Sequence, residues 1–208
     1  MKRFSLLLVL FSLASATHAD AQMRGYPYAP RLHSHRVGVE GGLGVLGGDL
    51  TKVSNDYHYR PVTNLEVAHM LHRNVVLGFS VGFGDLRSTS ADMESNTPFL
   101  TAGMLVELRL PLLRGSVFPL MQLRGGGVRI DPALRSGDVT FEGEASNHMA
   151  YGLAAGIEAV SWHQLGIRML FGVTYTTADR WDLIVRGDDN DGYSYAMLSL
   201  HYYFTFRR

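Results

Sequence analysis

The sequence predicts an all-β protein, an eight-stranded antiparallel up-and-down transmembrane β-barrel, and three observations support this fold class. Small or polar side chains alternate with bulky apolar ones in eight separate stretches, which is the period of a β-strand with two unlike faces. The apolar face of such a stretch runs for about ten residues, enough for a tilted strand to cross a bilayer. The connections between the stretches alternate between long and short, as they do in outer-membrane barrels.

The N-terminus has the features of an export signal. Lys2 and Arg3 precede an apolar run at 4–14, and the following Ala19–Ala21 has the small-x-small pattern of a signal peptidase site. We therefore expect residues 1–21 to be a signal peptide that is cleaved after Ala21. The apolar run has about eleven residues, whereas a retained helical anchor needs roughly twenty.

A short polar segment separates this signal from the first strand. Residues 22–35 contain two prolines and no apolar period, so we expect an extended leader on the periplasmic side, followed by the barrel at 36–208. His33 and His35 are possible metal ligands, but the neighbouring sequence offers no third ligand, so no metal site is expected there.

Eight strands are expected in the barrel, with seven connections between them. The strands are predicted at 36–46, 61–71, 75–86, 98–109, 117–130, 148–160, 164–176 and 192–206. The long connections are 47–60, 87–97, 131–147 and 177–191, and the short ones are 72–74, 110–116 and 161–163. Placing the long connections outside the cell and the short ones in the periplasm agrees with a leader that enters from the periplasm.

The alternation assigns an outward, lipid-facing phase to most strands. The third strand is the clearest, with Val75, Leu77, Phe79, Val81 and Phe83 outward, opposite a phase made largely of Gly and Ser. The fourth strand carries Leu100, Ala102, Met104, Val106 and Leu108 outward, and the sixth carries Met149, Tyr151, Leu153, Ala155 and Ile157. The seventh has Leu165, Ile167, Met169, Phe171, Val173 and Tyr175, and the eighth has Ala196, Leu198, Leu200, Tyr202, Phe204 and Phe206.

Three strands are less regular. The first two keep the period poorly, and in the fifth the phase is unclear at Gly125-Gly126-Gly127. A β-bulge at these glycines would let a tightly curved wall change register, so we expect one there.

Aromatic residues are expected to form two girdles, one at each membrane interface. The predicted members are Trp162, Tyr202, Phe204 and Phe206 at the periplasmic rim, and Tyr59, Tyr175, Trp181 and Tyr193 near the outer rim.

The inward phase gathers charged and amide side chains toward the periplasmic half of the barrel. The predicted lumen cluster consists of Glu40, Glu66, Glu107, Arg109, Gln122, Arg124, Glu158 and Arg168, with Gln164 beside it. Eight strands enclose a space just wide enough for side chains, and buried charges must be paired. We therefore expect a salt-bridged plug, with a gated proton or ion path as the alternative.

These features together resemble one family of membrane proteins. A signal peptide, eight alternating strands, unequal loops and the C-terminal strand YAMLSLHYYFTF at 195–206 are similar to the OmpA/OmpX-type outer-membrane β-barrels. The resemblance implies a place in the outer membrane of a Gram-negative-type bacterium, contact with its lipid, and handling by the barrel-insertion machinery. Family members commonly end on an aromatic residue, whereas here Arg207 and Arg208 follow Phe206.

No catalytic or cofactor site is expected. Lipid A deacylases of similar architecture use a His-x-Ser pair with a Glu on the lipid face, and no predicted strand contains that pair. Ser199-Leu200-His201 has the reverse order and faces the lumen, where no substrate reaches it. Residues 187–192 resemble a calcium loop but lack its acidic first ligand and its Glu at position twelve. An outer-membrane lipid-modifying hydrolase is therefore a weaker alternative than a small gated channel.

Composition narrows the function further. The chain has 19 basic and 19 acidic residues, and this balance gives no indication of nucleic-acid binding. It has no cysteine, so neither a disulfide nor a thiolate nucleophile is possible. We expect a structural or surface-interaction protein that meets any extracellular partner through its long loops. The rivals are the channel, the hydrolase and a soluble periplasmic lipid carrier with the two faces of its wall reversed.

Overall fold

The computed structural model describes residues 30, 32–47, 57–90, 93–113, 116–161, 164–177, 181, 183 and 191–205. The expected signal peptide, most of the leader, Trp162, Phe206 and most of the segment 187–192 lie outside these residues. Within the described ranges, no helix is long and apolar enough to cross a membrane.

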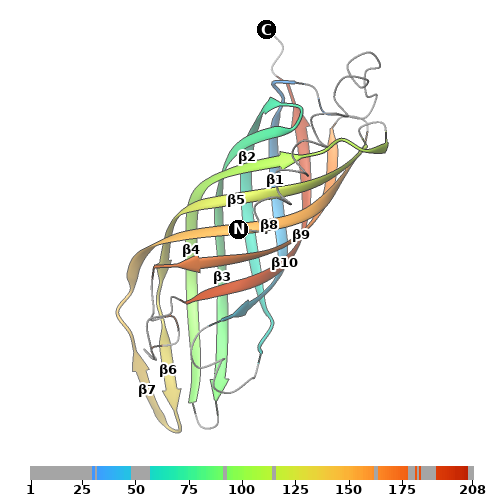
Figure 1. The fold of residues 1–208 in the computed structure, drawn as a ribbon. Coiled ribbons are helices and arrows are strands. Elements are labelled where there is room, and N and C mark those ends of the chain that lie inside the picture. Colours follow the sequence, from blue (N-terminus) through green and yellow to red (C-terminus); the bar gives the residue numbers. More distant parts are fainter. Residues whose placement is uncertain are drawn as a thin grey trace, which may run out of the picture.

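Eight long antiparallel strands form a closed barrel (Figure 1). They are β1 (His35–Leu46), β2 (Arg60–His72), β3 (Val75–Ser90), β4 (Met93–Arg109), β5 (Val117–Ile130), β8 (Ser146–Ser161), β9 (Leu165–Thr176) and β10 (Gly192–Phe204). Each pairs with the next of these strands along the chain. The last strand pairs with the first from His35↔Phe204 to Leu46↔Tyr193, which closes the sheet. The predicted all-β, eight-stranded barrel is confirmed.

The two ends of the barrel differ. At one end, which we call the turn end, β1 begins, β10 ends, and β2 joins β3 through the two residues 73–74. The β4–β5 and β8–β9 connections also lie at this end. At the opposite end, the loop end, β1, β3, β5 and β9 end, and an additional hairpin of β6 (Ala133–Ser136) and β7 (Val139–Glu142) is seen at the bottom of Figure 1.

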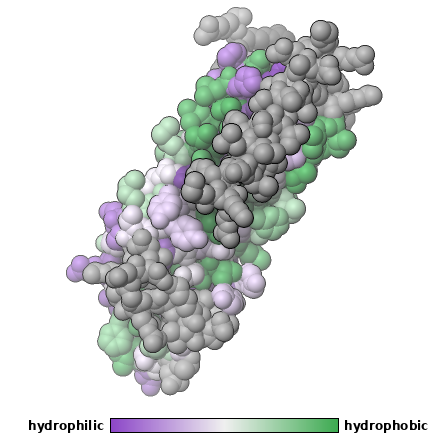
Figure 2. Space-filling model, viewed as in Figure 1, coloured by the Kyte–Doolittle hydropathy of each residue, from purple (hydrophilic) through white to green (hydrophobic). Residues whose placement is uncertain are grey.

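The outer surface of the barrel wall is apolar. On β10, Leu198 and Leu200 are 61% and 53% exposed, whereas the intervening Ser199 is 3% exposed. On β3, Phe79 and Phe83 point outward and Ser80 points inward. In Figure 2, apolar side chains cover much of the coloured part of the wall, and hydrophilic ones lie toward both ends of the barrel. This arrangement is the opposite of a soluble lipid carrier, so that rival is wrong.

Two of the expected loops contain regular structure. Strands β3 and β4 remain paired as far as Ser90↔Met93, through the segment 87–97 that was expected as a loop. The hairpin of β6 and β7 lies inside the expected loop 131–147, and β6 pairs with Met93–Asn96 of β4. The segment 87–97 is almost entirely polar, and β6 and β7 have only four residues each, so no sustained apolar period marked these strands. Their backbone hydrogen bonds hold them instead.

The expected bulge at Gly125–Gly127 is absent. Both β4 and β8 pair with β5 in unbroken register through these three residues. A Cβ atom on Gly126 would collide with the backbone of Ala102 and Gly103 on β4. The glycine therefore allows a close approach of two strands without an extra residue. Among the described strand pairs, a register shift occurs between Met70 and His72 of β2, beside β3.

Candidate functional site in the barrel interior

The interior has two main layers along the barrel axis, and a small apolar cluster of Met70, Phe118, Val160 and Tyr203 lies beyond them at the turn end. The half nearer the loop end is mainly apolar and includes Leu86, Phe99, Ile130, Trp181 and Tyr193. The half nearer the turn end holds four glutamates and four arginines, which we call the charged cluster. Its members are Glu40, Glu66, Glu107, Glu158, Arg36, Arg109, Arg124 and Arg168.

Arg168 on β9 connects the cluster across the barrel. Its Nη2 lies 2.5 Å from Oε1 of Glu40 on β1 and 2.8 Å from Oε2 of Glu66 on β2. Its Nη1 lies 2.5 Å from Oε2 of Glu107 on β4. All four side chains are fully buried, so water does not screen these interactions. One guanidinium thus links four strands that are not all neighbours in the sheet.

A second guanidinium, that of Arg36 on β1, binds from the turn-end side. Its two terminal nitrogens each lie 2.9 Å from one oxygen of Glu107, the paired geometry that suits arginine and carboxylate. Arg36 also forms an ion pair with Glu66. Arg36 was not among the predicted lumen residues, because it stands at the junction with the leader. The signal that would have found it is its phase, which is that of Glu40 four residues later.

The remaining charges are also paired. Nη1 of Arg109 donates to the Tyr203 hydroxyl at 3.0 Å, and that hydroxyl donates to Oε1 of Glu158 at 2.7 Å. Nη2 of Arg124 donates to Oε2 of Glu40 at 2.7 Å. With four carboxylates and four guanidiniums, the formal charge of the cluster sums to zero. This balance offsets the large cost of removing isolated charges from water.

Amide side chains complete the network. Nδ2 of Asn64 donates to Oε2 of Glu40 at 2.6 Å, and Oε1 of Gln122 accepts from Nε of Arg124 at 2.6 Å. Asn64 and Tyr203 were not predicted as members, although both lie on inward phases. Gln164, which was predicted beside the cluster, is instead exposed at the turn before β9.

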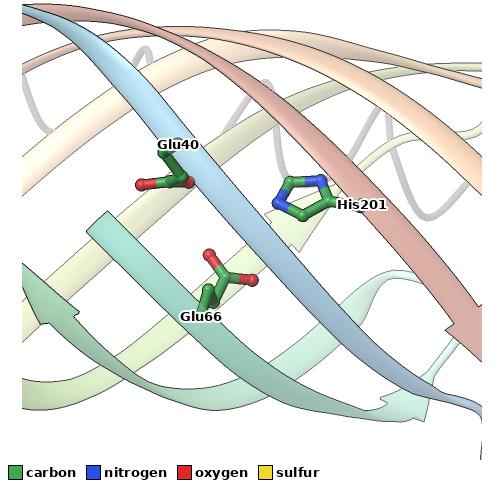
Figure 3. A group of neighbouring side chains, drawn as sticks. All are labelled: Glu40, Glu66 and His201. Atoms are coloured by element: carbon green, nitrogen blue, oxygen red, sulfur yellow. The ribbon is translucent and has the colours of Figure 1, made fainter. Parts of the chain in front are cut away.

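A possible metal site lies within the network. Glu40, Glu66 and His201 point toward one another in Figure 3, and one ligand atom from each lies within 4.8 Å of the others. Nη2 of Arg168 contacts all three residues, at 2.5 Å, 2.8 Å and 2.9 Å respectively. The protein's own cation therefore stands at the position that a metal ion would take.

The pair Ser199 and His201 is also bound within the network. Oγ of Ser199 donates to Oε1 of Glu40 at 3.4 Å. Nε2 of His201 accepts from Arg168, which can only donate, so Nδ1 carries the proton and donates to Oε1 of Glu158 at 3.3 Å. Both ring nitrogens are engaged, which leaves neither of them to activate the serine as a general base.

The predicted aromatic girdles are only partly supported by exposure. Tyr175 and Tyr202 are exposed on the outer wall near opposite ends, Phe204 is partly exposed near the turn end, and Tyr59 is exposed at the loop end. Trp162 and Phe206 fall outside the described part of the chain.

The girdle prediction is wrong for Trp181 and Tyr193, which are buried inside the barrel. Their ring centroids are 5.8 Å apart, and Phe99 packs against both. Nε1 of Trp181 donates to Oγ1 of Thr176 at 3.0 Å, and its backbone N–H donates to Asp191 at 2.9 Å. Trp181 therefore folds back into the mouth at the loop end.

Solved structures of outer-membrane barrels are similar to this chain. Neisserial surface protein A matches with a TM-score of 0.58 and 8% sequence identity, over 82% of this chain and 97% of that one. The attachment invasion locus protein Ail of Yersinia pestis matches with a TM-score of 0.54 and 11% identity, over 84% of this chain and all of that one. No protein-family model and no curated protein matches the sequence. These likenesses confirm the predicted fold.

Proposed function

We propose that this chain is an outer-membrane barrel with a permanently filled lumen, which acts at the cell surface through the structures at its loop end. The observation that supports this most directly is the charged cluster, whose arginines join carboxylates from different strands across the interior. Eight strands leave room for side chains rather than for a continuous water channel. A filled barrel is a scaffold, so recognition falls to the parts outside the membrane.

The wall and the two ends of the barrel support one orientation in the membrane. The apolar wall faces lipid, and the turn end, where β1 begins and β10 ends, faces the periplasm. The loop end then lies outside the cell. There the continued β3 and β4 and the hairpin of β6 and β7 form a small sheet beyond the barrel. On β7, Val139 and Phe141 are 54% and 55% exposed, which offers an apolar surface for a partner.

The filled lumen is tested by conductance. Purified protein inserted into a planar lipid bilayer is expected to give no stable single-channel steps, because the cluster leaves no path for ions. Large, stable steps would contradict the filled lumen and would favour a small channel instead.

The orientation is tested by labelling, which the absence of cysteine makes clean. Asp138 lies in the turn between β6 and β7, and Ser161 lies at the turn end of β8. A maleimide that does not cross membranes is expected to label Asp138→Cys in intact cells, and Ser161→Cys only after the outer membrane is permeabilised. The reverse pattern would show that the loop end faces the periplasm, and a surface role would then be lost.

A further inference from the structure

The connection between β4 and β5 exposes three leucines at the turn end of the barrel. Leu110, Leu112 and Leu113 are 36%, 50% and 73% exposed. The other two connections at this end differ, because the polar residues 73–74 join β2 to β3 and Gln164 is exposed just before β9. An exposed group of large apolar side chains marks a surface that meets another apolar phase.

Backbone hydrogen bonds hold this connection in a fixed shape. The N–H of Leu110 donates to the carbonyl oxygen of Pro119 at 2.9 Å, and the N–H of Leu112 donates to that of Val117 at 2.7 Å. The pairing of β4 with β5 thus continues beyond the end of β4. Because the leucines belong to this paired hairpin, they cannot fold back to bury themselves against the barrel.

The turn of the hairpin displays Leu113. The N–H and the hydroxyl group of Ser116 both donate to the carbonyl oxygen of Leu113, at 3.3 Å and 2.7 Å. Leu113 has a φ of 46°, in the left-handed region that bulky residues rarely adopt. Backbone strain of this kind is often found at functional positions. Here it occurs at the most exposed of the three leucines.

The leucines extend the lipid-facing phase of β4 beyond the strand. Met104 and Val106 point outward and are 59% and 39% exposed, and Leu108 follows on the same face. Leu110 and Leu112 continue this alternation at intervals of two residues. The apolar surface therefore runs from the barrel wall to the turn without a polar interruption. The hydrocarbon that covers the wall also suits the turn.

We propose that residues 110–113 are a lipid anchor, inserted among the acyl chains of the leaflet at the turn end. Acyl chains remove the leucines from water by extending the lipid contact of the wall along the same face. This inference rests on the proposed place of the barrel in a membrane, and it is independent of the surface role of the loop end. A periplasmic protein is the alternative occupant of the leucines, and a bilayer without that protein distinguishes the two.

The anchor is tested by fluorescence quenching of the purified barrel in phospholipid bicelles. The chain has no cysteine, so a fluorophore on one introduced cysteine reports one position. Leu113→Cys is compared with Gln164→Cys in the β8–β9 connection and with Val106→Cys on the wall. The label at 113 is expected to behave like the wall label and to be quenched by phospholipids with brominated acyl chains. Iodide in the water should quench it at least about threefold more weakly than the label at 164, because hydrocarbon excludes ions. Heat-modifiable migration on a gel confirms that each variant is folded.

Nuclear magnetic resonance of the wild-type barrel in the same bicelles gives a second readout that needs no substitution. The methyl groups of Leu113 are expected to show nuclear Overhauser contacts with acyl-chain methylene groups rather than with water. The proposal is overturned if iodide quenches the labels at 113 and 164 equally, if brominated chains quench them equally, or if the Leu113 methyl groups contact water. Each of these results would favour a protein-binding surface instead. Neither measurement depends on the lumen or on the loop end, so their failure leaves the proposed function standing.

Discussion

At the residue scale, Arg168 binds four buried partners in the interior. It forms ion pairs with Glu40, Glu66 and Glu107 and donates to His201, all without access to water. Buried ion pairs contribute little net free energy compared with apolar packing, since desolvation offsets the attraction. Removing one partner is different, because the groups left behind remain buried and unpaired.

Replacing Arg168 with methionine is expected to lower the free energy of unfolding by about 3–5 kcal/mol, because carboxylates then face one another without their shared cation. The measurement is urea unfolding in lipid vesicles, followed by the migration of unheated samples on a gel.

The control for this variant is Arg87→Met. Arg87 pairs with Glu94 at 2.7 Å on the β3 and β4 extension, but both side chains are more than a third exposed. A loss below about 1 kcal/mol is expected there. Equal losses of unfolding free energy in the two variants would show that burial does not increase the contribution of Arg168 to stability.

The position of the His201 ring depends on the space left by a glycine as well as on its hydrogen bonds. A Cβ atom on Gly38 would overlap the imidazole ring of His201. On the same strand, a Cβ on Gly41 would meet nothing within 4 Å. Gly38→Ala is therefore expected to destabilise the barrel by about 1–3 kcal/mol, the usual cost of overpacking. Gly41→Ala is the matched control and should change stability little in the same unfolding assay. A neutral Gly38→Ala variant would contradict this close packing.

At the scale of the elements, the wall between β4 and β5 depends on two facing glycines. Gly103 and Gly126 are partners in the register, and each lacks room for a Cβ atom against the opposite backbone. Backbone cannot move aside as a flexible side chain can. The strands therefore approach closely at this point without a change in register.

Gly126→Ala is expected to cost at least about 1–3 kcal/mol, because the added methyl group meets backbone atoms of β4. The adjacent Gly125 points outward, and a Cβ there would meet nothing within 4 Å. Gly125→Ala should consequently be neutral or stabilising in the same urea unfolding experiment, since alanine restricts the unfolded chain. If both variants lose the same stability, the loss does not arise from the close approach of β4 and β5 at Gly126.

At the scale of the whole molecule, the environment of each segment explains which features the sequence reveals. Within the barrel, lipid lies on one side of a strand and a crowded interior on the other, so Leu198 and Ser199 differ sharply and their faces are readable. Beyond the barrel both faces of β3 and β4 carry mainly polar side chains, and the pairing of Ser90 with Met93 left no trace in hydropathy. Trp181 follows β9 in a segment without a period, so nothing marked its return to the interior.

The charged cluster and Tyr193 show what the sequence of a strand reveals about the interior and what it does not. Glutamates and arginines on inward phases were readable because so few charges occur within the strands. Which carboxylate meets which guanidinium depends on the stagger of strands around the barrel, and the local sequence does not encode it. Tyr193 was placed in a girdle by its residue type, although its phase is opposite to that of Ala196 and Leu198. Phase is the better guide in a wall with two unlike sides.

The two main layers of the interior allow the effect of packing to be separated from the sealing of the barrel against ions. Trp181 packs with Phe99 and Tyr193 in the apolar layer near the loop end. Trp181→Ala is expected to lower the free energy of unfolding by about 3–5 kcal/mol, the usual cost of truncating a buried aromatic side chain. Tyr59→Ala, at an exposed aromatic residue near the same end, should change it by less than about 0.5 kcal/mol.

Conductance of the same Trp181→Ala variant then distinguishes the roles of the layers. If the charged cluster alone seals the barrel, the variant gives no stable channel steps in a planar bilayer, although its apolar layer is weakened. The cluster lies in the other half of the interior, and Arg168 still joins Glu40, Glu66 and Glu107 when Trp181 is removed. Stable steps that appear only in the variant would assign the seal to the tryptophan layer, and the charged cluster would then be a permeable lining rather than a plug.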